Sequence, residues 1–240
     1  MTGTPNPART PSQLATRQGV AVGVATAAYG VSFGALAVAA GLDVWQACVL
    51  SLLMFTGGSQ FALVGILASG GVAAGGTAIA SAVLLGVRNA AYGMRMKPIV
   101  GATGWWKNIA AAWLTIDEST AVALAQDEPA ARRRGFWVTG VIVYVGWNLT
   151  TLIGALIGDL LGDTRAYGLD AAAAAAFLGL IWPRLKSHQT IAVASAAAVV
   201  AAALTPVVAP GVPVIAAALV AVVVGVTNWL GSTGRGSEVS

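Results

Sequence analysis

The amino-acid sequence predicts an all-α integral membrane protein, a polytopic helical bundle of about 7–8 transmembrane segments. Three observations predict this class: 57% of the 240 residues are hydrophobic, only 9% are charged, and the mean hydropathy is +0.79. Soluble domains carry about 25% charged residues, so the 13 basic and 9 acidic side chains are too few for a water-soluble enzyme. One cysteine and one histidine exclude an intrachain disulfide, and we expect no metal site and no cofactor.

Apolar stretches of about 20 residues, the length that crosses a bilayer core, follow one another along the chain. In order, the candidate segments are Gly19–Ala40, Val44–Ser69, Val72–Met94, Asn108–Ala125, Gly135–Leu160, Gly168–Trp182, Thr190–Val208 and Gly211–Leu230. They predict a single transmembrane domain over residues 19–231, with a disordered N-terminal tail at 1–18 and a short C-terminal tail at 232–240. The segment Asn108–Ala125 contains Asp117 and Glu118, so a full span, a re-entrant half-helix and a surface helix all remain open.

Loop charges predict the orientation, because lysine and arginine concentrate on the cytoplasmic side. The run 132–134, three arginines, places the loop before the fifth segment in the cytoplasm, and the later crossings return the C-terminus to that side. Arg9 and Arg17 favour a cytoplasmic N-terminus as well. Four full spans would then leave Arg95, Lys97 and Lys107 outside, so we expect one of the first four segments to be discontinuous.

The second segment is the best candidate for a discontinuous helix. Its length of about 39 Å as a helix exceeds a core of about 30 Å, and Gly57-Gly58 stands near its middle. A break there would let Ser59 cap a second half-helix whose N–H groups receive a carboxylate, as transporters of small anionic or zwitterionic substrates do. Close packing of helices at the two glycines is the alternative.

Three charged residues stand inside apolar segments. Arginine within the bilayer core costs at least about 2.5 kcal/mol, so we expect Arg88 to pair with Asp117 or Glu118 unless its helix ends at Val87 and the side chain reaches the headgroups. A carboxylate facing a cavity would suit a coupling ion or a substrate ammonium group. The alternative is a helix turn at the membrane surface with both acids in water.

We expect the other polar residues to have structural rather than substrate-binding roles. In the fifth segment we expect Tyr144, Trp147, Asn148, Thr150 and Thr151 to form hydrogen bonds between helices rather than to touch a substrate. We expect Cys48 in the core and His188 in a loop. A serine hydrolase with Ser59 as nucleophile and His188 as base is a weak alternative, because Ser59 should lie deep, His188 in a charged loop, and Ser59 does not stand in a G-x-S-x-G element.

Several of these motifs together resemble the AzlC (YgaZ) family, the large subunit of bacterial branched-chain amino acid exporters. Phe55-Thr56-Gly57-Gly58-Ser59-Gln60-Phe61 resembles the family's F-x-G-x-S-Q-F segment, and Tyr29-Gly30-Val31-Ser32-Phe33-Gly34 resembles its first helix without the proline. Arg88, Asn89 and Tyr92-Gly93 are similar to its N-L-R-H-x-x-Y-G, and Thr115-Ile116-Asp117-Glu118 to its L-T-D-E. The family asparagine is Gly86 here, and the histidine after the arginine is Asn89, which removes a titratable group.

The resemblance implies a secondary exporter of branched-chain or other small apolar amino acids in the cytoplasmic membrane, acting with a small hydrophobic AzlD-like subunit. It carries over Gly57, Gly58, Ser59, Gln60 and Arg88 as substrate-binding positions, and Asp117 and Glu118 for ion coupling or for the substrate ammonium group. A passive channel or a structural membrane subunit is the main alternative. No nucleotide-binding P-loop is present, so we expect the chain to be neither an ATPase nor another enzyme.

Overall fold

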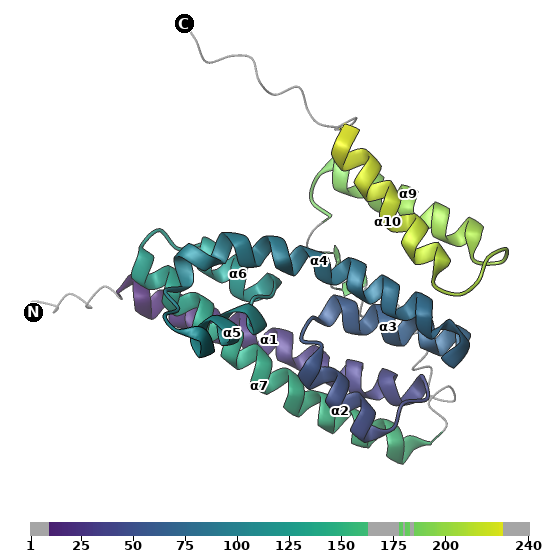
Figure 1. Ribbon diagram of the computed structural model, residues 1–240, viewed down its shortest axis with the longest axis horizontal. Coiled ribbons are helices and arrows are strands. Elements are labelled where there is room, and N and C mark those ends of the chain that lie inside the picture. The colour runs from purple at the N-terminus through teal and green to yellow at the C-terminus, as the bar shows by residue number, and fades with distance from the viewer. Residues whose placement is uncertain (1–9, 163–177, 180, 183–184, 228–240) are drawn as a thin grey trace, which may run out of the picture.

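The computed structural model describes residues 10–162, 178–179, 181–182 and 185–227, and every element it defines there is helical (Figure 1). The helices are α1 (Pro11–Ala39), α2 (Val44–Leu53), α3 (Gly57–Gly70), η1 (Val72–Ala74), α4 (Gly75–Val100), α5 (Trp105–Trp113), α6 (Asp117–Leu124), α7 (Pro129–Leu161), α9 (His188–Leu204) and α10 (Val212–Thr227). The predicted segment Gly168–Trp182 lies mostly outside the described residues. The predicted tail 232–240 lies entirely outside them.

The first helix begins earlier than expected, inside the segment predicted to be a disordered tail. Thr10 and Gln13 form a reciprocal capping box, with Gln13 N–H donating to Thr10 Oγ1 at 3.4 Å and Thr10 N–H to Gln13 Oε1 at 3.1 Å. Pro11 occupies the first turn, where its missing N–H costs nothing. The capping signal therefore starts α1 at Pro11 rather than at Gly19.

Three helices within the described ranges are long and apolar enough to cross a membrane: Pro11–Ala39, Val72–Val100 and Pro129–Leu161. Two other predicted segments are each divided into two short helices, α2 with α3 and α5 with α6. The apolar helices α9 and α10 are shorter and pack on each other as a hairpin, whose turn contacts α4 through the hydrogen bond from Thr77 Oγ1 to the Pro210 carbonyl at 2.8 Å (Figure 1). A total of 7–8 transmembrane segments stays a prediction.

Helices α1 and α7 are parallel and pack closely through small residues. Contacts advance in the same direction along both, from Gly19 against Thr139 to Gly34 against Ala155. A Cβ on Gly34 would collide with the backbone of α7, and one on Gly154 would collide with the backbone of α1. Glycines that let backbones approach this closely are typical of helix pairs in membranes. The starts of α1 and α7 therefore lie at the same end of the bundle.

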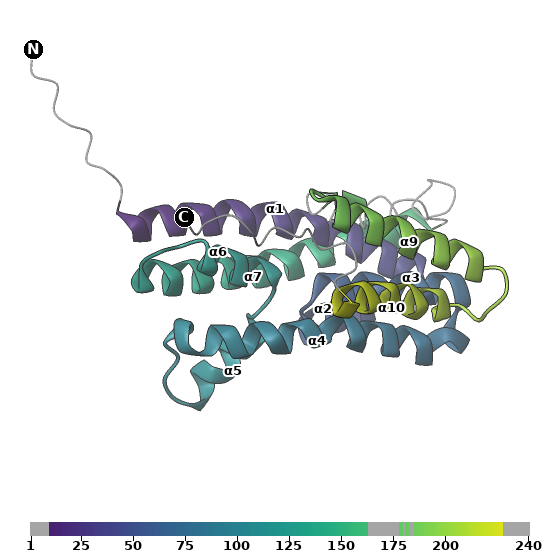
Figure 2. The ribbon, with the colours of Figure 1, turned by 90° about the horizontal axis from the view of Figure 1, so that it is seen from above.

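That end also holds the end of α4 and the loop before α7. Trp137 Nε1 donates to the Val100 carbonyl at 3.1 Å, and Gln126 Nε2 donates to Gln18 Oε1 at 2.8 Å. We call this the basic end, because it carries the arginine run 132–134 and the end of α4, with its lysine and arginine. Helix α4 runs antiparallel to α1, so its start lies at the opposite end (Figure 2).

This arrangement makes both divided segments re-entrant hairpins. Helix α2 starts directly after α1 at the opposite end, and α3 returns to that same end, where η1 leads into α4 (Figure 1). Helix α5 starts at the basic end, and α6 returns to it before α7. Two of the first four segments are therefore discontinuous rather than one, and neither crosses the bundle. As a result, Arg95, Lys97 and Lys107 lie at the same end as the arginine run.

Candidate functional site

A cavity of about 590 Å³ lies where the two re-entrant hairpins meet. Its described walls are Thr26, Phe55, Thr56, Gly57, Gly58, Leu85, Arg88, Asn89, Ile116, Asp117, Glu118, Val143, Trp147, Leu178, Ile181, Leu185, Ala194 and Ala198. Five of the seven residues that the sequence nominates are in this wall. The other two, Ser59 and Gln60, are fully buried behind it.

The break between α2 and α3 gives one wall of the cavity. Helix α2 ends at Leu53, and α3 begins at Gly57 after Thr56, whose backbone is extended at φ −158°. The discontinuity predicted near Gly57-Gly58 is thus present, just before the two glycines. The first N–H groups of a helix have no acceptor within it. The start of α3 therefore presents N–H donors and a positive dipole end to the cavity.

The predicted cap at Ser59 is wrong. The residue before α3 is Thr56, and no side chain caps this helix. Ser59 lies inside the first turn, because the break falls before the glycines rather than after them. Its hydroxyl is buried without a hydrogen-bond partner among the described residues, and a Cβ on Gly86 of α4 would lie 3.6 Å from it.

Gln60 holds the break together instead of facing the cavity. Its Nε2 donates to the Met54 carbonyl at 2.7 Å and more weakly to the Ser51 carbonyl at 3.4 Å. Its Oε1 accepts a hydrogen bond from Trp147 Nε1 at 2.8 Å. One buried amide thus satisfies carbonyls freed by the end of α2 and fixes an indole of the cavity wall.

Arg88 lies midway along α4 and joins the two hairpins. The helix continues to Val100, so the alternative in which it ends at Val87 is wrong. Arg88 Nη1 forms an ion pair with Asp117 Oδ2 at 3.2 Å, one of the two pairings that the sequence predicts. On its other side, Nη2 would lie 3.1 Å from a Cβ on Gly58. The guanidinium therefore bridges the start of α3 and the start of α6.

The break between α5 and α6 forms the facing wall. Asp117 and Glu118 occupy the first turn of α6, and both line the cavity. Ser119 fastens this break: its Oγ donates to the Leu114 carbonyl at 2.6 Å and accepts from Ile116 N–H at 3.1 Å. The segment is divided into two short helices, which matches the re-entrant half-helix among the three arrangements left open. The starts of α3 and α6 therefore face the same cavity. The start of α6 carries two acidic residues, and the start of α3 carries none.

Sequence reasoning underrated the aromatic wall. Trp147 is 4% exposed, its ring stacks against Phe33 at 6.2 Å, and it meets Phe61 edge-on at 6.2 Å. A Cβ on Gly57 would come within 3.1 Å of it. The signal was an indole in the middle of a span, away from the interface where tryptophan concentrates. Asn89 was also passed over, and its Oδ1 is buried without a partner among the described residues.

Two of the remaining polar residues of α7, Thr150 and Thr151, tie helices together as predicted, whereas Asn148 Nδ2 donates within α7, to the Tyr144 carbonyl at 2.7 Å. Thr150 Oγ1 donates to the Ala27 carbonyl of α1 at 2.6 Å, and Ser51 Oγ of α2 donates to Thr151 Oγ1 at 3.3 Å. His188 is the exposed first residue of α9, and no hydrogen bond links it to Ser59 in the described structure. The geometry required for a serine nucleophile with a histidine base is therefore not formed by these residues.

Long apolar helices around a charged cavity, with helix breaks at its walls, are typical of membrane transport proteins. A model of the AzlC protein family matches residues 21–161, and the chain belongs to this family. The match begins inside α1 and covers α2 to α7, so it includes both helix breaks. The family is a component of membrane transport and not a group of enzymes, so the chain is a transport-related membrane protein. No curated protein and no solved structure matches it.

Proposed function

We propose that the protein is a secondary exporter of branched-chain or other small apolar amino acids in the cytoplasmic membrane. The observation that carries the proposal is the division of charge across one cavity. Gly57, Gly58 and Arg88 form a positive wall, while Asp117 and Glu118 lie in the facing wall. A zwitterion matches this arrangement, because its carboxylate and its ammonium group each find a complementary partner.

The substrate carboxylate binds at the start of α3. There the N–H groups of Gly57, Gly58 and Ser59 supply donors, and the absence of Cβ atoms at the two glycines lets a ligand approach the backbone. The two Nη atoms of Arg88 add a fixed positive charge. Ser59 takes part through its backbone only, and Gln60 acts by holding the break.

The rest of the substrate faces the other walls. The ammonium group lies toward Asp117 and Glu118, and the apolar side chain lies against Phe55, Val143 and the Trp147 ring. Apolar walls with a few convergent polar groups are the usual composition of small-molecule sites.

The ion pair between Arg88 and Asp117 supplies a coupling element. A carboxylate that binds Arg88 competes with Asp117 for the same guanidinium, so substrate binding and the charge state of Asp117 depend on each other. Displaced from its partner, Asp117 becomes available to the coupling ion. This links export to an ion gradient.

Counterflow of radiolabelled leucine into proteoliposomes tests the function. Saturable counterflow distinguishes a carrier from the alternatives, a passive channel or a structural subunit. Arg88→Gln removes hydrogen bonds to a charged group, each worth about 1.5–3 kcal/mol, so we expect affinity to fall by about tenfold to a hundredfold. Arg95→Gln is the matched control, because it removes the same charge from an exposed position on the same helix.

Asp117→Asn keeps the shape of the side chain but not its charge, and we expect it to abolish the dependence of transport on the ion gradient. The site proposal fails if Arg88→Gln and Asp117→Asn insert normally and transport leucine at the rate of Arg95→Gln. If an AzlD-like partner is obligatory, we expect the unsubstituted chain to show no counterflow by itself. Co-expression of the small subunit should then restore counterflow. We also propose a cytoplasmic C-terminus, based on the loop charges.

A further inference from the structure

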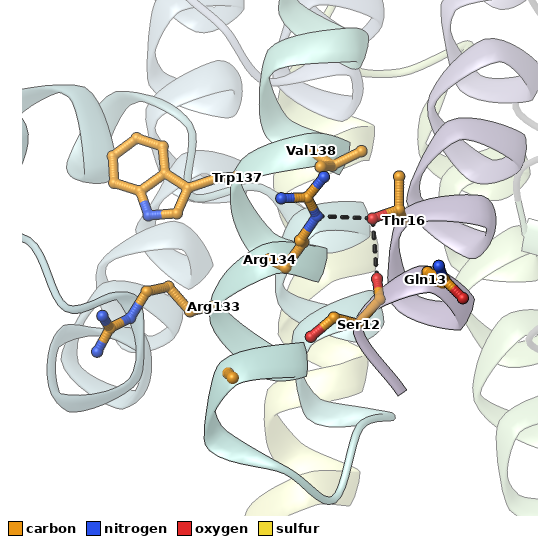
Figure 3. Close-up of a pocket in the computed structure, with 8 residues that line it drawn as sticks. Ser12, Gln13, Thr16, Arg133, Arg134, Trp137 and Val138 are labelled. Carbon is orange, nitrogen blue, oxygen red and sulfur yellow. Dashed lines mark hydrogen bonds between the residues drawn. The ribbon is translucent and has the colours of Figure 1, made fainter. Parts of the chain in front are cut away.

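A second cavity, of about 650 Å³, lies at the basic end between the first turns of α1 and α7. Ser12 and Thr16 line it from α1, and Arg133, Arg134 and Trp137 line it from α7 (Figure 3). It shares no residue with the cavity between the hairpins. Nothing in the proposed transport cycle uses it.

The two arginines offer charge that no acidic side chain of the described residues neutralises. Arg134 Nε donates to Thr16 Oγ1 at 2.8 Å, and Thr16 in turn donates to the Ser12 carbonyl at 2.9 Å. These two hydrogen bonds fix the guanidinium of Arg134 through its Nε, so both of its Nη groups can donate to a ligand. Arg133 packs against the backbone of Gly101. Neither arginine forms an ion pair with a carboxylate of the described residues.

Their neighbour in the run behaves differently, which shows that the run is not uniform. Arg132 Nε donates to the Gln126 carbonyl at 2.7 Å and closes the loop before α7. It does not line the cavity. The free donors at this end therefore belong to Arg133 and Arg134, whose side chains extend from different sides of α7 (Figure 3).

The length of α7 sets the depth of the cavity. Its 33 residues measure about 50 Å as a helix, whereas the bilayer core is about 30 Å thick. The first turns therefore project beyond the core on the arginine side. Trp137 follows one turn later, and tryptophan favours the level of the headgroups. Both guanidinium groups thus lie at the height of lipid phosphates.

Below Arg134, an exposed apolar stripe continues along the same face of α7. Val141, Val145, Leu149 and Leu152 follow at helical spacing, and they are 46%, 52%, 57% and 40% exposed. Residues three and four apart share one side of a helix. A fixed positive group at one end of this stripe and bare aliphatic side chains along it match the two parts of a phospholipid.

We propose that this cavity is a binding site for an anionic phospholipid, with the phosphate at Arg134, with Arg133 adding positive charge from another side of α7, and with an acyl chain along the α7 stripe. The same phosphate chemistry would fit a free anion. The apolar stripe and the depth at headgroup level favour the lipid. Basic sites between transmembrane helices bind lipid headgroups in this way.

The test measures lipid retention and stability, independently of transport. The protein is delipidated in neutral detergent and mixed with phosphatidylglycerol, with phosphatidylcholine or with inorganic phosphate at the same phosphate concentration. Native mass spectrometry counts bound lipid, and a thermal melt reports stabilisation. We expect phosphatidylglycerol alone to be retained and to raise Tm.

Three variants make the outcome decisive. The double change Arg133→Gln with Arg134→Gln should weaken phosphatidylglycerol binding by about tenfold or more, whereas Arg17→Gln with Lys107→Gln, which removes equal charge outside the cavity, should leave it unchanged. Arg133→Gln alone keeps the Arg134–Thr16 bond and guards against a folding defect. The proposal is overturned by equal retention of both lipids, by equal retention in both double variants, or by inorganic phosphate reproducing the rise in Tm.

Discussion

The buried side chain of Gln60 gives a quantitative test of how the first helix break is held. It donates to the Met54 carbonyl at 2.7 Å and accepts from Trp147 Nε1 at 2.8 Å. Leucine is similar in size but has no polar side-chain atoms, so Gln60→Leu leaves Trp147 Nε1 without its partner, whereas the Met54 carbonyl keeps the Thr56 N–H at 2.8 Å. An orphaned buried group costs about 1–3 kcal/mol, so we expect the free energy of unfolding to fall by about 1–3 kcal/mol.

A double-mutant cycle isolates the bond between the two side chains. Trp147→Phe alone leaves Gln60 Oε1 unpaired in the core. In the variant that combines Gln60→Leu with Trp147→Phe, neither partner of this bond remains, so the penalty for an orphaned group is not incurred twice. We expect the double variant to lose about 1–3 kcal/mol less than the sum of the two single losses.

The assay is a denaturant titration in mixed detergent micelles, followed by far-ultraviolet circular dichroism. Gln18→Leu is the matched control, because Gln18 accepts a hydrogen bond of the same 2.8 Å length at an exposed position. That change should stay within about 0.5 kcal/mol. The reasoning is refuted if Gln60→Leu costs no more than Gln18→Leu, or if the cycle is additive within about 0.5 kcal/mol.

The remaining predictions concern topology and helix packing. In a Cys48→Ser background, Val72→Cys should react with a membrane-impermeant maleimide added outside cells, and Thr103→Cys only after the cytoplasmic side is opened; four full crossings would give the reverse pattern. Gly34→Ala should lower the unfolding free energy by about 1–3 kcal/mol, because its Cβ meets a carbonyl of α7. Gly65→Ala, which meets open space, should raise it by about 0.5–1 kcal/mol; equal effects of the two would contradict the packing of α1 on α7.

Sequence reasoning located the cavity wall because charge is scarce in this chain. Only 9% of the residues are charged, so Arg88 and Asp117 stand out inside apolar segments. The sequence predicted that Arg88 pairs with either Asp117 or Glu118, and the structure has the pair with Asp117. The first break was equally legible, because adjacent glycines weaken a helix in a segment longer than a span needs. These are local signals, and the structure agrees with them.

The path of the chain after each break was not predictable in the same way. A glycine pair weakens a helix, but it does not determine whether the chain then continues across the membrane or turns back. The turn depends on what the half-helices pack against: α2 lies on α7, whereas α3 lies on α4. The useful signal was that four full spans put Arg95, Lys97 and Lys107 outside, against the preference of basic residues for the cytoplasmic side. One broken segment was expected, and reversal of two removes the conflict.

The supporting roles of Ser59 and Gln60 were also out of reach. Both follow the glycines directly, which made them candidates for contact with a substrate. Their direction depends on where α3 starts, and that start is set by the extended backbone of Thr56. A half-helix beginning at Gly57 places both side chains in the core. The cavity wall therefore keeps Phe55, Thr56 and the two glycines of this motif, but neither the Ser59 nor the Gln60 side chain.

The two helix breaks present the same dipole to the cavity but carry different charge, and this difference would orient the proposed zwitterionic substrate. A helix start is equivalent to about +0.5 charge. At α6 the carboxylates of Asp117 and Glu118 compensate it, whereas α3 has no acidic residue in its first turn and lies against Arg88. A reversed substrate would set its carboxylate beside two others. Charge alone therefore selects one orientation, whichever end of the bundle the cavity opens to.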